Sequence, residues 1–199
     1  RECGKYQNMN IDLVESVKKL HRNGLRVMGG FIVGFDSDTE DIFDIQKDFI
    51  QKTGITVAMV GMLGALPGTK LWNRLEKEGR LINGNSSGNN TDHTTNFIPK
   101  MGYETLVSGY LEMLKYLYAP KNYYNRIYTF IKEYNPNVKG DSIDGHALKI
   151  FWQCVKLIGF KSKNKLYWWN LLRKTAFWRP KKLPIGVELA IFGQHLFKV

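Results

Sequence analysis

The stretch Leu25-Arg26-Val27-Met28-Gly29-Gly30-Phe31-Ile32-Val33-Gly34-Phe35 decides the fold, because it is almost entirely apolar and shows no alternation with polar residues. A strand that is apolar at nearly every position is typical of a parallel sheet that is covered on both faces. A second run of the same kind spans Ile55 to Leu63. The sequence therefore predicts two parallel strands that are close together in the chain.

Helical patterns lie on both sides of the first strand. Asn10 to Asn23 has apolar residues at helical spacing, with Asn10 as the expected N-cap, and Gly24 follows as a stop signal. Ser37-Asp38-Thr39-Glu40 has the spacing of a capping box and predicts that a second helix begins there and ends at Gly54. The two helix-ending glycines are 30 residues apart, which is the length of one β/α unit.

The rest of the chain predicts a loop and then a helical region. Thr69 is expected to cap a short helix that runs through Glu78, and residues 83–99 are a long loop rich in Asn, Gly and Ser. Five further helices are expected over 103–119, 121–134, 145–159, 163–178 and 185–197. The expected domains are thus an α/β part over 1–82, the polar loop over 83–99 and a mostly α-helical domain over 100–199.

Charge and aromatic content change at the same boundary. Residues 1–99 contain 12 basic and 12 acidic residues, whereas residues 100–199 contain 17 basic and 6 acidic residues and 19 of the 26 aromatic residues. The whole net charge of +11 therefore lies in the second half. Such a shift supports a domain boundary near residue 100.

Two apolar parallel strands do not make a sheet that is stable alone, because their edges leave backbone groups unpaired. Either the basic helices cover these strands or, as we expect, further strands lie upstream in the same polypeptide. Parallel α/β sheets bind ligands beyond the carboxyl ends of their strands, which here are residues 34–38 and 62–69. Gly29, Gly30 and Gly34 would let a flat ligand such as adenine approach the first strand, or would simply relieve crowding between helix and strand.

No residue pattern predicts acid–base, nucleophilic or metal chemistry, so the catalytic residues stay unknown at this stage. The two cysteines, Cys3 and Cys154, are too far apart to form a metal-ligand motif or a disulfide framework. No apolar run is long enough to span a bilayer, and no leader is evident. The expected location is the cytoplasm, with room for peripheral association at a membrane.

Several segments resemble one family, the radical S-adenosylmethionine enzymes that carry an N-terminal cobalamin-binding domain and an uncharacterised C-terminal domain. Gly30-Phe31-Ile32-Val33-Gly34 looks like the glycine-isoleucine-glycine motif on the fifth strand of their barrel, and Ala65 to Leu71 is similar to the turn after the sixth strand. The other similar segments are residues 5–8, 29–36, 96–101 and 118–127. Some relatives in this family act on hopanoid lipids.

This resemblance implies an α/β fold made of the last two β/α units of a partial (β/α)6 barrel, followed by a mostly helical domain. It also implies a share of the S-adenosylmethionine site, in which Gly30, Ile32 and Gly34 line the adenosine, Asp36 lies near the ribose, and Met62-Leu63 pack by the adenine. The family's three cluster cysteines and its cobalamin domain are absent from this chain. The 4Fe-4S cluster and cobalamin would therefore be bound only in the full-length protein, and this chain would not be active alone.

The basic, aromatic segment Lys161 to Pro184 has eight basic residues and no acidic residue. It could bind anionic lipid headgroups or a lipid-like substrate, or less readily RNA. Alternatively its aromatic residues form a core, since the apolar residues of 165–179 go nearly all the way round the helix. The predicted function is the C-terminal part of a radical S-adenosylmethionine enzyme, and the alternative is a non-enzymatic basic helical module on an α/β scaffold.

Overall fold

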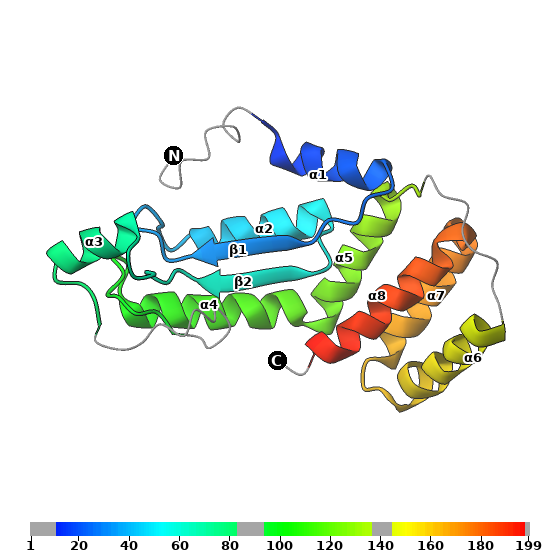
Figure 1. Cartoon of the computed structure of the whole chain (residues 1–199). Coiled ribbons are helices and arrows are strands. Elements are labelled where there is room, and N and C mark those ends of the chain that lie inside the picture. Colours follow the sequence, from blue (N-terminus) through cyan, green and yellow to red (C-terminus); the bar gives the residue numbers. More distant parts are fainter. Residues whose placement is uncertain (1–10, 83–93, 137–144, 198–199) are drawn as a thin grey trace. The chain divides into compact units, whose positions relative to one another are not determined.

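The computed structural model describes residues 11–82, 94–136 and 145–197 of the chain (Figure 1). Its elements follow the order α1 (Leu13–Arg22), β1 (Gly29–Val33), α2 (Ile42–Thr53), β2 (Ala58–Met62), α3 (Lys70–Lys77), α4 (Tyr103–Tyr118), α5 (Pro120–Glu133), α6 (Gly145–Cys154), the π-helix η2 (Val155–Lys161), α7 (Lys165–Trp178), the short 3-10 helix η3 (Pro180–Lys182) and α8 (Leu183–Leu196).

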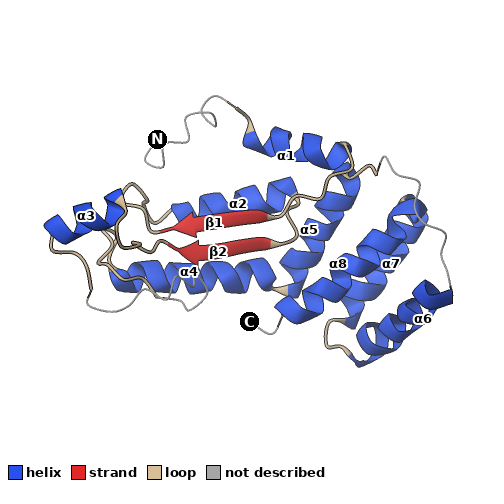
Figure 2. Cartoon of the chain, viewed as in Figure 1, coloured by secondary structure: helices blue, strands red, loops and turns tan. Residues whose placement is uncertain are grey.

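The two strands pair in parallel, with α2 as the crossover between them (Figure 2). The register runs from Gly29 opposite Ala58 to Val33 opposite Met62. This pairing confirms the predicted mixture of parallel strands and helices. The partial barrel itself stays a prediction, because the described residues contain this one pair of strands.

Helices α2 and α4 cover one face of the sheet. The Tyr110 hydroxyl in α4 donates to the carbonyl of Val60 at 3.1 Å, and the Gln46 amide in α2 donates to the carbonyl of Ile32 at 3.0 Å. Val33, Ala58, Val60 and Met62 are buried on this side. The expectation that both faces are covered is wrong for the described part of the chain, because Ile32 and Met59, on the opposite face, are 42% and 65% exposed.

Helix α2 begins later than the capping-box spacing predicts. It starts at Ile42, and the Asp38 carboxylate instead accepts hydrogen bonds from the backbone N–H groups of Gly34 (2.9 Å) and Phe35 (3.0 Å). Gly34 and Phe35 are the first two residues after β1, so the Asp38 side chain closes a turn at the end of this strand. The segment predicted as the first helical turn thus forms the exit from the strand.

The other helix ends follow the sequence signals. Gly24 and Gly54 have φ values of 82° and 75°, which favour glycine, and they follow α1 and α2 as expected. The Thr69 hydroxyl accepts from the Trp72 N–H at 3.2 Å and caps α3. Helix α1 is capped by Asp12, while Asn10, the predicted cap, lies outside the described residues.

The chain divides into two compact units. The first, here called the sheet unit, contains residues 28–48 and 57–116, and the second, the helical unit, contains residues 10–27, 49–56 and 117–199. The helical unit thus includes α1 and the end of α2 besides the basic segment. Its boundaries differ from those expected from charge, because packing groups segments that are distant in sequence.

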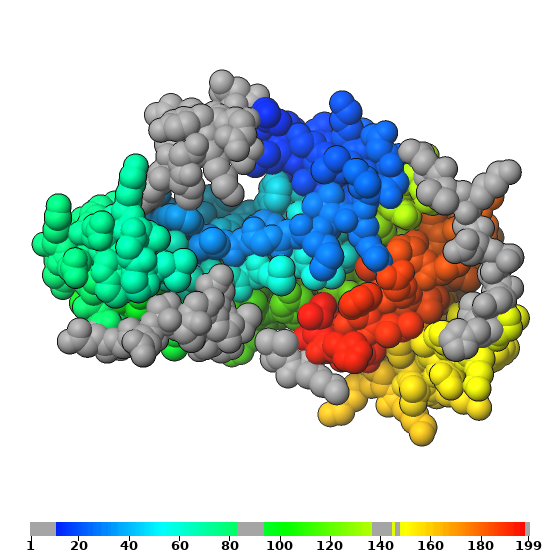
Figure 3. All heavy atoms as spheres, in the orientation of Figure 1, coloured from blue at the N-terminus to red at the C-terminus, as the bar shows by residue number. Residues whose placement is uncertain are grey.

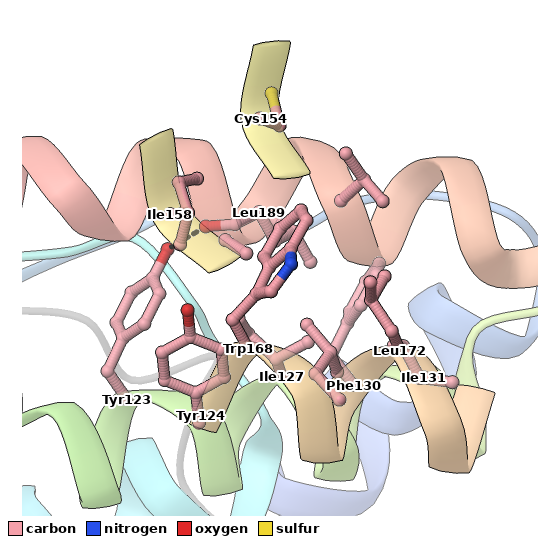
Figure 4. Packing of buried hydrophobic residues seen from close by; sticks show 13 residues of the cluster. Tyr123, Tyr124, Ile127, Phe130, Ile131, Cys154, Ile158, Trp168, Leu172 and Leu189 are labelled. Atoms are coloured by element: carbon pink, nitrogen blue, oxygen red, sulfur yellow. Dashed lines mark hydrogen bonds between the residues drawn. The ribbon is translucent and has the colours of Figure 1, made fainter. Parts of the chain in front are cut away.

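The helical unit has a continuous core (Figure 4). The indole of Trp168 is fully buried among side chains of α5, α7 and α8, and the Tyr123 hydroxyl donates to the carbonyl of Leu189 at 2.8 Å. The Arg126 guanidinium is also buried and donates to the carbonyl of Leu117 at 2.7 Å. His21 packs edge-on against Phe130, and burial lowers the pKa of its imidazole, as suits a core histidine.

Aromatic residues of the basic segment divide into two groups. Trp168 lies in the core, whereas Phe177 and Trp178 are 78% and 76% exposed. A second departure concerns the helix predicted over 145–159, which is α-helical only to Cys154 and continues as the π-helix η2. Within the described ranges, no helix combines the length and apolar character that a membrane span requires.

Candidate functional site

The uncovered face of the two-stranded sheet is the first candidate site, and its atoms are visible in the space-filling view (Figure 3). Ile32 is 42% exposed and Met59 is 65% exposed, although both are large apolar residues in the middle of strands. Gly30 pairs with Met59 in the register and is exposed, and a Cβ added to Gly30 would meet nothing within 4 Å. We call Gly30, Ile32 and Met59 the open face.

The register separates the predicted site residues into two groups. Gly30 and Ile32 point to the open face, whereas Met62 is opposite Val33 and is buried on the covered face. Leu63 follows the strand and packs partly buried against Ala65, Leu75 and Phe97. The structure therefore brings Gly30 and Ile32 together but places Met62 on the other side of the sheet, and Met59 takes the neighbouring position on the open face.

Gly34 ends the first strand with a φ of 101°, which suits glycine and strains other residues. A Cβ at this position would also lie 2.9 Å from Cδ2 of Leu106 in α4. Gly34 therefore allows both the turn and the close approach of α4. The crowding explanation for this glycine has a direct structural basis, whereas Gly30 has open space beside it.

Asp36 lies at the carboxyl edge of the sheet and is bound by two arginines. Its carboxylate accepts from Arg80 at 2.7 and 3.0 Å and from Arg74 at 2.9 Å, and its side chain is only 8% exposed. Hydrogen bonds and charge from Arg80, followed by the charge of Arg74, hold the pKa of Asp36 below its ordinary value of 3.8. Asp36 is thus a fixed anion that ties the end of β1 to α3 and to the residues after it.

The segment after the polar loop is attached to the end of β2. The Thr95 hydroxyl donates to the carbonyl of Leu63 at 2.8 Å. The Asn96 side chain accepts from the Ala65 N–H at 2.8 Å and donates to the Ala65 carbonyl at 2.7 Å. These bonds satisfy the backbone groups of Leu63 and Ala65 after β2, as a further strand would.

The open face can bind a ligand, but none of its three described residues, Gly30, Ile32 and Met59, can act as a general acid or base. The open face offers apolar side chains, a glycine with free space beside it and the backbone of two strands, which together leave room for a flat ring. Across the described ranges, no three His, Cys, Asp or Glu side chains come close enough to hold a metal ion. Cys154 is buried in the helical unit, and its burial raises the pKa of the thiol.

Sequence reasoning missed Met59, Arg74 and Arg80. Met59 could have been found by counting alternate positions on β2, if the register with β1 had been known. The arginines could not have been found in this way, because Arg80 is 44 residues from its partner Asp36.

Comparison with known proteins assigns the chain to a family. The family model described as a domain of unknown function (DUF4070) matches residues 69–199. The chain belongs to this family. The DUF4070 match begins at the cap of α3, and therefore includes part of the sheet unit as well as most of the helical unit.

Three curated proteins are similar to this DUF4070 chain. An uncharacterized methyltransferase of Synechocystis is 38% identical over 68% of the chain and 25% of its own length. The hopanoid C-2 methylase of Rhodopseudomonas palustris is 35% identical over 44% of the chain and 17% of its own length. The bacteriochlorophyllide d C-12(1)-methyltransferase of Chlorobaculum tepidum is 24% identical over 57% of the chain and 27% of its own length.

The chain thus spans about a quarter or less of the first two of these relatives. No solved structure gives a significant match. The DUF4070 match and the methylase relatives support the resemblance to the C-terminal region of cobalamin-related radical S-adenosylmethionine enzymes.

Proposed function

We propose that this chain is the C-terminal part of a cobalamin-dependent radical S-adenosylmethionine methyltransferase, to which the sheet unit contributes the adenosine side of the cofactor site. The observation that carries the proposal is the open face, where Gly30, Ile32 and Met59 leave an apolar strand surface uncovered. An isolated domain gains stability by burying such a surface, at about 25 cal/mol per Å². An apolar face left open on two parallel strands is therefore best explained by a ligand and by neighbouring strands.

Each predicted site residue has a role in this proposal. Gly30 and Ile32 form the wall, and Met59 joins them. Gly34 forms the turn at which this wall ends, and Leu63 lies directly after the second strand. Asp36 and Met62 act indirectly, since Asp36 is held by two arginines and Met62 packs on the covered face.

The remaining cofactors would be held elsewhere in the polypeptide. When bound, the 4Fe-4S cluster and S-adenosylmethionine supply the radical step, and cobalamin carries the methyl group. The two cysteines of this chain do not suffice for a three-cysteine cluster site. The residues of this chain would orient the adenosine and exclude water from it.

The test is isothermal titration of S-adenosylmethionine into the full-length protein and its Gly30→Ala variant. A methyl group at Gly30 would occupy the free space that the adenosine needs, so we expect roughly tenfold weaker binding. Gly145→Ala is the matched control, because a Cβ at Gly145 also meets nothing within 4 Å but lies in the helical unit. Equal affinities for the Gly30→Ala variant and the unaltered protein would remove the proposed wall.

We also propose that the helical unit contributes a surface for a lipid-like substrate or an anionic membrane. Support comes from Phe177 and Trp178, which are exposed beside the basic residues of the segment, and from the hopanoid C-2 methylase among the relatives. Flotation with phosphatidylglycerol vesicles should recover the chain, and the Phe177→Ser, Trp178→Ser double variant should lose most of that recovery. Recovery with pure phosphatidylcholine to the same extent would contradict an anionic requirement.

A further inference from the structure

The helical unit contains a cavity that the proposed cofactor site does not use. It has a volume of about 390 Å³ and lies between α5 and the end of α7. Its wall includes Tyr128 and Lys132 from α5, Lys174, Thr175 and Trp178 from α7, and Arg179 directly after α7. Three of these six side chains are cationic, and the lining contains no carboxylate.

Two polar groups of this cavity are buried without a partner. The hydroxyl oxygens of Tyr128 and Thr175 have no hydrogen-bond partner among the residues that the structure describes, and Thr175 is only 3% exposed. A buried hydroxyl that lacks a partner destabilises the folded chain, because it has lost its hydrogen bonds to water. Such a cost is offset when an acceptor reaches the group, and both residues belong to the lining of the cavity.

The local electrostatics also favour an anion. The Nζ atom of Lys174 lies 4.8 Å from the centre of the Tyr128 ring, so the ammonium stays over the phenol instead of pairing with a carboxylate. Glu133 follows Lys132 in sequence, but its carboxylate pairs with Arg22 at 2.8 Å. The C-terminal end of α7 contributes a partial negative charge of about half a unit, which three full positive charges outweigh.

We propose that this cavity is a binding site for a phosphate group attached to an aromatic or other apolar moiety. Lys132, Lys174 and Arg179 would neutralise the phosphate, and the hydroxyls of Tyr128 and Thr175 would donate hydrogen bonds to its oxygens. Trp178, which is 76% exposed at the rim, would cover the apolar part of the ligand. This site shares Trp178 with the proposed lipid surface, but it does not depend on the proposed methyl transfer and can be tested without it.

The test titrates the whole chain with phenyl phosphate, inorganic phosphate and benzyl alcohol in a calorimeter. Phenyl phosphate combines the charge and the ring, so it should bind more tightly than inorganic phosphate or benzyl alcohol. Lys174→Gln should weaken phenyl phosphate binding roughly tenfold, because it removes one charge-assisted hydrogen bond. Thr175→Val, which keeps the shape of the side chain, should weaken it severalfold for the same reason, by about 1 kcal/mol.

Lys165→Gln is the matched control, since it removes an equal charge from the exposed start of the same helix and outside the cavity. Its affinity for phenyl phosphate should stay within about twofold of the unaltered chain, because surface charges act weakly at a distance. Circular dichroism of each variant checks that the helices are intact. Failure of the unaltered chain to bind phenyl phosphate, or an equal loss with Lys165→Gln and Lys174→Gln, would overturn the proposal.

The source of the phosphate can be separated by competition. Phosphatidic acid vesicles that bind the chain and are displaced by phenyl phosphate would identify a lipid headgroup in this site. Phenyl phosphate binding without vesicle binding would identify a soluble ligand in the same site. The chain could instead bind an RNA 20-mer that phenyl phosphate does not displace, with equal affinity in the Lys165→Gln and Lys174→Gln variants. That result would overturn the proposed site and indicate diffuse polyanion binding.

Discussion

The cores of the two units are closed to different extents. The helical unit places Trp168 at 0% exposure among Tyr123, Tyr124 and the other members of its core, whereas the sheet unit leaves Met59 at 65% exposure in the middle of a strand. The helical unit thus completes its core with its own residues. The sheet unit completes only one face.

This difference separates stability from function. A core that is closed by its own side chains contributes to the free energy of unfolding, and substitutions there are costly wherever the cavity cannot collapse. An open strand face contributes little to that free energy until a neighbour or ligand covers it. Substitutions should therefore affect stability in the helical unit and on the covered side of the sheet, and should affect binding on the open face.

The largest effect should come from Trp168→Ala. This change removes a fully buried indole, so we expect the free energy of unfolding to fall by roughly 3–5 kcal/mol in urea denaturation. Trp178→Ala is the matched control, because the same side chain is 76% exposed there and its loss should cost under about 0.5 kcal/mol. Similar losses for both variants would mean that the helical unit does not have a closed core.

Asp36→Asn in the sheet unit should lower the free energy of unfolding by a smaller amount. The change removes the anion that Arg74 and Arg80 share, and it should lower the free energy of unfolding by about 2 kcal/mol at pH 7. Asp44→Asn is the control, since the Asp44 carboxylate is 81% exposed and pairs with Lys47 of its own helix at 2.6 Å. That surface pair should contribute under about 0.5 kcal/mol.

The difference in the free energy of unfolding between the unaltered chain and Asp36→Asn should depend on pH. Because the folded-state pKa of Asp36 lies below its ordinary value of 3.8, its contribution is complete above that value and is lost as the pH falls through the folded-state pKa. The stability difference between the unaltered chain and Asp36→Asn should therefore be constant from about pH 7 to pH 5 and shrink below about pH 4. A constant difference down to pH 2 would show that the ion pair does not carry it.

Gly109→Ala tests the packing of the covered side of the sheet unit. A Cβ at this position would clash with the ring of Phe43, which is buried. The helix would gain about 1 kcal/mol from alanine, but overpacking costs up to about 3 kcal/mol, so we expect a net loss of roughly 1–2 kcal/mol. Gly30→Ala on the open face should leave the thermal midpoint within a few degrees, and a drop equal to that of Gly109→Ala would mean that the face is covered.

Much of the fold could be predicted from local sequence. The two apolar runs, the glycines at positions 24 and 54 and the Thr69 cap each act within a few residues, and each appears in the structure as expected. The start of α2 was misplaced because the Asp38 carboxylate binds the amides of Gly34 and Phe35. Two local motifs compete for this carboxylate, and spacing alone does not decide between them.

The candidate site was harder to predict because it depends on pairing across the chain. In an all-apolar strand, Phe31 and Ile32 look alike, and only the register with β2 assigns Ile32 to the open face. The same difficulty explains the choice of Met62 in place of Met59. In the helical unit, the apolar residues of α7 surround the helix, so sequence could not tell that Trp168 is buried and Trp178 exposed.

The smallest effect should be that of Ile32→Ala, which bears most directly on the comparison. Ile32 is 42% exposed, so its truncation should cost under about 1 kcal/mol in urea denaturation of this chain, whereas Val33→Ala next to it removes methyl groups that are fully buried and should cost about 2 kcal/mol. The order should change in the full-length protein, where Ile32 would be covered by neighbouring strands and by the adenosine. If Ile32→Ala costs as little there as in this chain, nothing covers the open face and the proposed wall is wrong. If it already costs as much as Val33→Ala in this chain, the face is closed from the start and the contrast between the two units fails.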